Sequence, residues 1–483
     1  MPQILPWTAL GSLALHLTIV IGLVIRVLSK RKPTGVSMAW ITLLLTFPFA
    51  GVVIYVLVGE TWLSGTRTKR NAIAIDQLSE PIKAFDRRFG AVFDEKRPAA
   101  RAVAALGRAS GFGPPLGGNA VTLLGNATES FKALIADIES AERSCDLLYY
   151  IWQPAGRVLE IHSALIRARK RGVVCRVLVD AVGGGEFLRG PYAEQLQAEG
   201  VEVGASLPVN FLRGTLHRVD IRNHRKLAVI DDRVAHVGSL NMADPEFFMR
   251  NEGFGKWVDL NCRVSGPAAA LLGDLFEADW AMESGEPVRS QIDASATDRE
   301  GTEIIQVIPS GPGQHTASLF QILTTAVYGA TESLTITTPY FIPDEAFVSG
   351  LVAAAMRGVD VTLVVPAKVN GPLVRYASMA YYDDLIDAGV KIFLYHKGLL
   401  HAKTIAVDDE LAVIGTVNID RRSFWLNYEL SLVLHGRVSV ESLRAIQNRY
   451  LTDSTPITDS PWMRRGRVQK LTEQAMQLLS PIL

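Results

Sequence analysis

The chain contains one eight-residue pattern twice, HRKLAVID at residues 224–231 and HAKTIAVD at residues 401–408. A second pair of segments follows at the same distance from each copy, GSLN at 238–241 and GTVN at 415–418. Two different motifs that recur in register are the signature of an internal repeat. The soluble part of the chain is therefore predicted to be a duplicated domain.

Short runs rich in Val, Ile and Leu alternate with helical segments from about residue 106 onward. DLLYYIW at 146–152 and VTLVVP at 361–366 have the composition of buried strands, whereas ATESFKALIADIESAE at 127–142 is typical of an amphipathic helix. This alternation predicts an α/β fold, with two mixed sheets flanked by helices and related by a pseudo-twofold axis.

The N-terminal region is strongly apolar. Residues 1–25 contain no charged side chain, and about 20 apolar residues are enough to cross a bilayer. We predict a transmembrane helical hairpin with spans at about 4–26 and 36–59. A secretory signal peptide is the alternative, but such a peptide carries positive charge before its apolar run. No such charge precedes this one, and a second apolar stretch follows it.

These patterns divide the chain into five expected segments. They are a membrane hairpin at 1–62, a juxtamembrane linker at 63–115, a first domain at 116–285, a linker rich in Gly, Ser, Asp and Glu at 286–301, and a second domain at 302–483.

Composition excludes several classes of protein. The 483 residues include 49 Lys plus Arg and 49 Asp plus Glu, so the formal net charge is zero, which argues against a globally basic nucleic-acid binder. A hydrophobic content of 48% is too high for a disordered protein. Cys145, Cys175 and Cys262 form no paired Cys motif, so zinc ribbons and disulfide scaffolds are excluded.

Each repeat combines side chains that suit phosphate chemistry. Successive side chains of an extended segment alternate, so His224 and Lys226 share one face, and His401 and Lys403 do likewise. Asn241 and Asn418 add amide donors after a turn. If the copies pack about a pseudo-twofold axis, these side chains surround one cavity.

Such a cavity suits a phosphodiester. The lysines and asparagines neutralise and hydrogen-bond its oxygens, one imidazole attacks phosphorus, and the other moves protons to and from the reacting oxygens. Glu252 and Glu429 lie at the same distance beyond the two histidines. We expect each glutamate to orient the histidine of its own copy, as a triad carboxylate does.

The remaining motif residues complete the candidate site. Ser239 and Thr416 are expected to bind substrate beside the asparagines. Asp231 and Asp408 belong to the candidate catalytic motif, but they directly follow apolar strands, which favours a structural role. No acidic cluster in the sequence offers ligands for Mg²⁺ or Zn²⁺, so we expect a mechanism without metal or cofactor.

The doubled HxKxxxxD pattern with GS or GT-x-N resembles the phospholipase D superfamily over nearly all of residues 116–483. Three further segments look like bacterial cardiolipin synthases of that superfamily. They are KRKPTGVSMAWITLLLTFPFAGVVIYVLVGE at 30–60, VIPSGPG at 307–313 and TTPYFIPD at 337–344.

The resemblance implies transfer of a phosphatidyl group between two phosphatidylglycerol molecules, which gives cardiolipin and glycerol. It also implies a multi-pass protein of the bacterial inner membrane that does not bind nucleic acid. An oligomeric state is possible, and the sequence does not determine it. By resemblance His224 is the nucleophile and His401 is the general acid and base. Lys226, Lys403, Asn241 and Asn418 would bind the phosphate. The near symmetry of the repeats leaves the order of the two histidines open.

Three alternatives differ in class. A hydrolase of the same fold would release phosphatidic acid, and the motifs do not separate water from alcohol as acceptor. A nuclease is disfavoured by the zero net charge and the hairpin. A non-catalytic membrane scaffold would have lost motif residues, whereas both motifs are intact.

Overall fold

The computed structural model describes residues 7–30, 34–47, 49–60, 65–93, 97–208, 220–288, 294–295, 297–312, 318–369, 371–457, 462 and 464–478. The chain forms two compact units. One comprises Met1–Gly65 with Val209–Ile221, and the other comprises Thr66–Pro208 with Arg222–Leu483.

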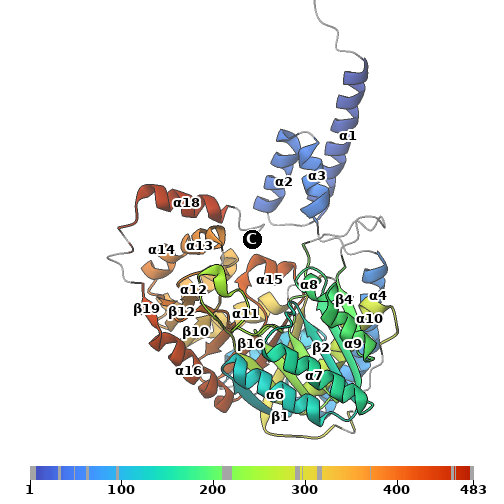
Figure 1. Ribbon diagram of the computed structural model, residues 1–483. Coiled ribbons are helices and arrows are strands. Elements are labelled where there is room, and N and C mark those ends of the chain that lie inside the picture. Colours follow the sequence, from blue (N-terminus) through green and yellow to red (C-terminus); the bar gives the residue numbers. More distant parts are fainter. Residues whose placement is uncertain are drawn as a thin grey trace, which may run out of the picture. The chain divides into compact units, whose positions relative to one another are not determined.

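The first unit contains the N-terminal helices α1 (Trp7–Ser29), α2 (Thr34–Thr46) and α3 (Ala50–Val58) (Figure 1). The predicted second span is therefore two short helices. Pro48 lies in the sequence between them, and proline lacks the N–H that a continuous helix needs. Within the described residues no helix combines the length and the apolar character needed to cross a membrane, so the spans predicted at 4–26 and 36–59 are not confirmed.

The segment predicted as a linker at 63–115 is largely helical. It forms α4 (Gly65–Phe89) and α5 (Pro98–Ala109). Leu78, Ile82, Phe85 and Phe89 of α4 are buried in the main core of the second unit. Their spacing of three and four residues puts them on one face of the helix, so α4 is a structural part of the second unit.

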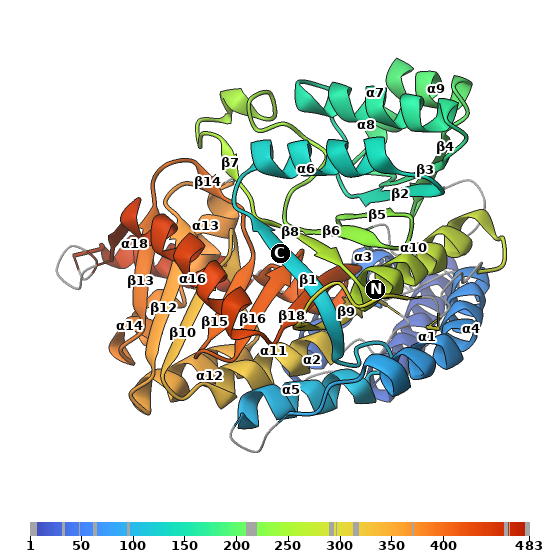
Figure 2. The same cartoon turned by 90° about the horizontal axis from the view of Figure 1, so that it is seen from below.

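Most strands of the second unit join into one sheet, where two sheets were predicted. Its 15 strands follow the order β19-β13-β12-β10-β15-β16-β18-β9-β1-β8-β6-β5-β2-β3-β4 (Figure 2). The two halves meet where β1 (Leu116–Leu124) pairs antiparallel with β9 (Glu303–Ser310). Each is the first strand of its repeat, and this pairing covers two edges that would otherwise be open.

The strand order reads alike outward from that central pair. The first half runs β1, β8 (Asn261–Ser265), β6 (Val234–Gly238), β5 (Leu227–Ile230), β2 (Ser144–Tyr149), β3 (Val174–Asp180) and β4 (Glu202–Ser206). The second half runs β9, β18 (Glu429–Leu434), β16 (Leu411–Gly415), β15 (Thr404–Val407), β10 (Ser333–Thr337), β12 (Asp360–Pro366) and β13 (Lys391–Tyr395), with β19 (Ser454–Pro456) added at the edge. This correspondence agrees with the predicted pseudo-twofold duplication.

Helices cover both faces of the sheet. On one face lie α6 (Ala127–Ser140), α7 (Arg157–Lys170), α8 (Gly185–Leu188) and α9 (Pro191–Ala198) in the first half, and α11 (Ser318–Gly329), α12 (Glu345–Met356), α13 (Pro372–Met379) and α14 (Tyr382–Asp387) in the second. On the other face lie α10 (Pro267–Ser284) and α16 (Arg437–Thr452). The short α15 (Arg421–Trp425) and the C-terminal α18 (Arg467–Gln477) complete the unit (Figure 1).

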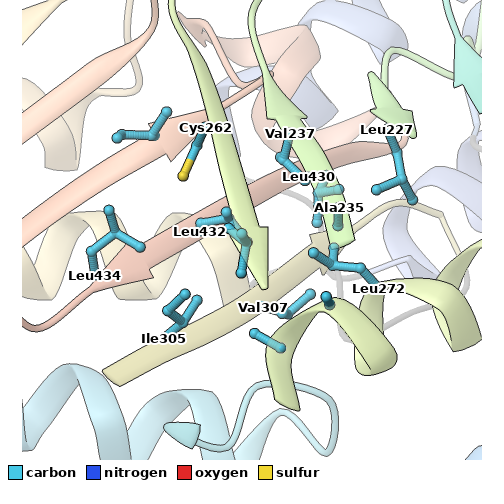
Figure 3. Packing of buried hydrophobic residues seen from close by; sticks show 14 of the residues in the cluster. Leu227, Ala235, Val237, Cys262, Leu272, Ile305, Val307, Leu430, Leu432 and Leu434 are labelled. Atoms are coloured by element: carbon cyan, nitrogen blue, oxygen red, sulfur yellow. The ribbon is translucent and has the colours of Figure 1, made fainter. Parts of the chain in front are cut away.

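Apolar side chains from both halves meet in one core. Figure 3 shows Val237 and Cys262 of the first half beside Leu430, Leu432 and Val307 of the second. All five side chains are buried, and burying one such side chain contributes about 1.5–3 kcal/mol. The shared core therefore holds the two repeats as one body, which fixes the strand ends that carry both motifs.

Candidate active site

Both motif histidines are held by the half of the unit to which they do not belong. The backbone N–H of His224 donates to the carbonyl of Tyr428 at 2.8 Å, and that of His401 donates to the carbonyl of Val258 at 2.8 Å. Val258 and its neighbour form β7 (Trp257–Val258), which pairs in parallel with β14 (Leu399–Leu400) just before His401. The exchange of backbone contacts brings the two motifs together.

The carboxylates beside the histidines also come from the opposite half. His401 Nδ1 lies 2.6 Å from Asp259 Oδ1, and the two atoms form a hydrogen bond. His224 Nδ1 lies 3.3 Å from Glu429 Oε1, without hydrogen-bond alignment. Asp259 and Glu429 are both buried, so each histidine faces a buried carboxylate of the other repeat, and the hydrogen bond to Asp259 fixes the orientation of the His401 ring.

This pairing corrects the expected roles of the two glutamates. Glu252 is exposed in the 3₁₀ turn Arg250–Glu252, and among the described residues it contacts neither histidine. Glu429 does face a histidine, but it is His224 and not His401. The equal spacing of the two glutamates is a coincidence. The first repeat carries a longer loop before its last strand, so the residue that corresponds to Glu429 is Asp259 and not Glu252.

A local signal for Asp259 is present in the sequence. VDLNCRV at 258–264 matches YELSLVL at 428–434, with an acidic residue in second place and alternating apolar residues after it. Strand-based alignment, which tolerates a loop insertion, would have found it, whereas a fixed spacing does not.

Ser239 and Thr416 act on these carboxylates. The hydroxyl of Ser239 donates to Asp259 Oδ1 at 2.6 Å and accepts the N–H of Leu260 at 3.0 Å. Thr416 makes the same pair of bonds with Glu429 and Leu430. These hydroxyls therefore orient the carboxylates, and the expectation that they bind substrate is not supported by their contacts.

The motif lysines lie beside their own histidines, as predicted from strand alternation. Lys226 Nζ donates to the carbonyl of His224 at 2.7 Å, and Lys403 Nζ donates to that of His401 at 2.5 Å. Burial lowers the pKa of Lys226 to about 8 and holds the pKa of Lys403 well below its usual value. A buried ammonium group favours binding of an anion nearby.

The pKa values of both histidines are lowered, which favours the neutral form of each ring. Burial, followed by the charge of Lys403, lowers the pKa of His401 to about 3. Burial and Lys226 also lower the pKa of His224, and Lys403 of the other half contributes to this shift. Charges of each motif thus act on the histidine of the other, as expected for one shared site.

Asp231 and Asp408 hold backbone rather than substrate. Asp231 accepts the N–H groups of Glu142, Arg143 and Ser144 at 2.7–2.9 Å. Asp408 accepts those of Thr331, Glu332 and Ser333 at 2.8–2.9 Å. Each aspartate follows the central strand of its motif and ties it to the start of a neighbouring strand, which is the structural role that we expected.

A cavity of about 270 Å³ opens beside His224. Its lining includes Tyr150, Tyr340 and Asn418. The side chain of His224 is 15% exposed, whereas that of His401 is 5% exposed. Asn418 Oδ1 has no hydrogen-bond partner in the described part of the chain; in the first repeat, Asn241 Oδ1 accepts the N–H of Ile151 at 3.2 Å.

The arrangement supplies the parts of a two-step phosphoryl transfer. It provides two neutral imidazoles, each with a carboxylate at Nδ1, and two buried ammonium groups. Displacement at a phosphodiester requires one ring nitrogen that attacks phosphorus, another that transfers a proton, and cations beside them. The Nε2 atoms of the two rings remain available for these two roles. Fold and site together define a duplicated enzyme of the phospholipase D superfamily.

Comparison with known proteins narrows the family. The model described as "Cardiolipin synthase, PLD-like domain" matches residues 134–280 and 323–451, and one described as "Phospholipase_D-nuclease N-terminal" matches residues 18–60. Cardiolipin synthase A of Pectobacterium carotovorum subsp. carotovorum (strain PC1) is 38% identical over 472 residues, 96% of each chain. Cardiolipin synthase A of Yersinia pseudotuberculosis serotype O:1b (strain IP 31758) is 36% identical over 481 residues, also 96% of each chain.

The fold is shared more widely. The crystal structure of phosphatidylserine synthase from Haemophilus influenzae Rd KW20 matches with a TM-score of 0.58 at 14% identity, covering 81% of this chain and 100% of that one. The chain belongs to the cardiolipin synthase family. It is a phosphatidyltransferase of the phospholipase D type with cardiolipin synthase activity.

Proposed function

We propose that this enzyme joins two phosphatidylglycerol molecules through a covalent phosphohistidine on His224. The observation that carries the assignment is the difference between the histidines. His224 lines the cavity and contacts Glu429 loosely at 3.3 Å, whereas His401 is more deeply buried and hydrogen-bonded to Asp259 at 2.6 Å. A nucleophile must reach phosphorus, while a proton carrier needs a fixed ring.

In the first step His224 Nε2 attacks phosphorus, and the bond from phosphorus to the headgroup oxygen breaks. His401 gives a proton to that oxygen, and glycerol leaves. Burial lowers the pKa of His401, and a bound phosphodiester anion nearby favours the protonated form that this step needs. Lys226 and Lys403 neutralise the charge that grows on the non-bridging oxygens.

In the second step a hydroxyl of another phosphatidylglycerol attacks the same phosphorus. The bond from phosphorus to His224 Nε2 breaks, a phosphorus–oxygen bond forms, and the hydroxyl proton returns to His401. Cardiolipin is released. Water as acceptor would instead give phosphatidic acid, which is the hydrolase alternative.

We further propose that the enzyme works at the bacterial inner membrane as a multi-pass protein. This proposal is supported by the apolar composition of residues 1–25, the match of residues 18–60 to an N-terminal family model and the lipid substrate. An anchor at the bilayer raises the local concentration of phosphatidylglycerol at the site.

The test is product analysis after incubating the purified full-length protein with phosphatidylglycerol as the only lipid and no added metal. We expect cardiolipin and glycerol in equal amounts. Phosphatidic acid with glycerol would identify a hydrolase, and absence of any product would remove phosphatidylglycerol as the donor.

A further inference from the structure

The cavity beside His224 contains more polar groups than phosphate binding needs. Besides Asn418, it is lined by Arg222, Asp420, Arg422 and Asn427. Arg222 Nε and Asn427 Oδ1 are buried and have no hydrogen-bond partner within the described ranges. Unsatisfied buried polar atoms are rare in proteins, and their convergence on one cavity indicates a ligand with several hydrogen-bonding groups.

Asp420 is the unexpected member of this group. Its side chain is buried, and a carboxylate repels the phosphate of an anionic lipid. Its Oδ1 accepts the N–H of Ser423 at 2.7 Å and caps the five-residue helix α15. Serine, threonine or asparagine would serve equally as a cap, so capping alone does not account for a charged group facing the cavity.

The other repeat has no such carboxylate. Asn241-Met-Ala243 corresponds to Asn418-Ile-Asp420, so Ala243 occupies the equivalent position. The next residue, Asp244, is buried too, but it accepts the backbone N–H groups of Arg157 and Glu246, each at 3.0 Å. Among the described residues that line the cavity, the carboxylate comes from the second repeat, and this is the side on which His224 is accessible.

We propose that this cavity binds the glycerol headgroup of phosphatidylglycerol, with Asp420 accepting a hydrogen bond from its secondary hydroxyl. This inference rests on the proposed function. Holding that hydroxyl places the primary hydroxyl toward the phosphorus on His224, where it attacks in the second step. Glycerol leaving in the first step occupies the same place, because the second step reverses the first with a new alcohol.

Charge favours a polyol over an ammonium group in this cavity. Arg222 and Arg422 line it beside Asp420, and Arg222 also contacts the carboxylate of Asp180 at 3.3 Å. Two guanidinium groups oppose a cationic headgroup such as ethanolamine. Asn427 joins the cavity to the site, because its amide N–H donates to Glu429 Oε1 at 3.4 Å while its Oδ1 has no hydrogen-bond partner among the described residues.

The test compares acceptors that differ by one hydroxyl. Full-length enzyme in phosphatidylglycerol vesicles is given deuterated glycerol and 1,3-propanediol at equal concentration, and labelled phosphatidylglycerol and phosphatidylpropanediol are counted by mass spectrometry. We expect the wild type to favour glycerol by about tenfold or more, because a site that binds a hydroxyl rejects an analogue without it. Asp420→Asn keeps the cap of α15 and should lower this ratio about tenfold.

Two further variants are measured beside Asp420→Asn. Asp409→Asn changes an exposed carboxylate of the same repeat and should keep the wild-type ratio, while Asn427→Ala should lower it. An unchanged ratio in Asp420→Asn, or a wild type that does not discriminate, would overturn the assignment, and a wild-type preference for added ethanolamine would make the cavity an ammonium site instead. Failure of the wild type to transfer to any alcohol would contradict the proposed function itself.

Discussion

The two repeats have the same strand order and the same motif histidines and lysines, but the surroundings of the two histidines differ. His224 is partly exposed to a cavity and lies 3.3 Å from Glu429, whereas His401 is enclosed and lies 2.6 Å from Asp259. The residue after each histidine differs too. Arg225 is fully buried and bonds both oxygens of Asp279 at 2.6 Å, and Ala402 takes its place in the second repeat.

This difference shows how a duplicated fold produces two unequal catalytic groups. Symmetry supplies two histidines and two lysines on one site, yet a two-step displacement needs one group that bonds phosphorus and one that moves protons. The inequality comes from carboxylates and cavity walls outside the repeated motifs. Four predictions test this comparison, from the largest expected effect to the smallest.

The largest effect is expected for the histidines. His224→Ala and His401→Ala should each lower cardiolipin formation by about 10⁴-fold or more. A phosphatidyl donor with a good leaving group needs no acid, so with it His401→Ala should accumulate a covalent adduct that mass spectrometry detects, and His224→Ala should not. If the covalent adduct formed only in His224→Ala, His401 would be the nucleophile and His224 the group that transfers protons.

The carboxylates come next. Asp259→Asn removes the charge that fixes His401 and should lower kcat by about 10²–10³-fold, while Glu429→Gln, which has the longer contact, should cost about tenfold to 10²-fold. Glu252→Gln is the matched control and should stay within about twofold of wild type. A large loss of kcat in Glu252→Gln would instead support the expectation that each glutamate orients the histidine of its own repeat.

Removal of the ion pair unique to the first repeat should act on stability. Asp279→Ala leaves the buried Arg225 without its carboxylate and should lower the free energy of unfolding by about 3–5 kcal/mol, measured as a fall in Tm. Asp409→Ala breaks an exposed pair with Arg444 at 2.9 Å and should cost about 0–1 kcal/mol. Similar losses in both variants would mean that Arg225 finds other partners.

The smallest effect concerns pH. Burial lowers the pKa of His224, so the ring of this nucleophile stays neutral and able to attack when the pH falls below the usual histidine value. The acid limb of kcat/KM should therefore lie below pH 6.5, with less than about twofold loss between pH 7 and pH 6. Glu429 favours the charged form of His224, so Glu429→Gln should move the limb to lower pH. A limb at or above pH 6.5 would show that His224 is solvated.

Much of the fold and part of the site were predictable from the sequence. The in-register motifs predicted the duplication, and alternation along a strand predicted that each lysine lies beside its histidine, because both depend on local spacing. The merged sheet was not predictable in this way, since it depends on pairing between β1 and β9, almost 200 residues apart. The break between α2 and α3 has a visible signal in Pro48, because proline lacks the N–H that a continuous helix needs.

The sequence by itself determined that two His-Lys pairs exist and that they belong to a repeated α/β unit. Only the tertiary structure decided which carboxylate serves which histidine, because Asp259 and Glu429 reach across the two halves and spacing within a repeat carries no information about the other repeat. The same holds for Asp420. Its place in the sequence marks a helix cap, and only the packing of the second repeat against the first puts its carboxylate in the cavity beside His224.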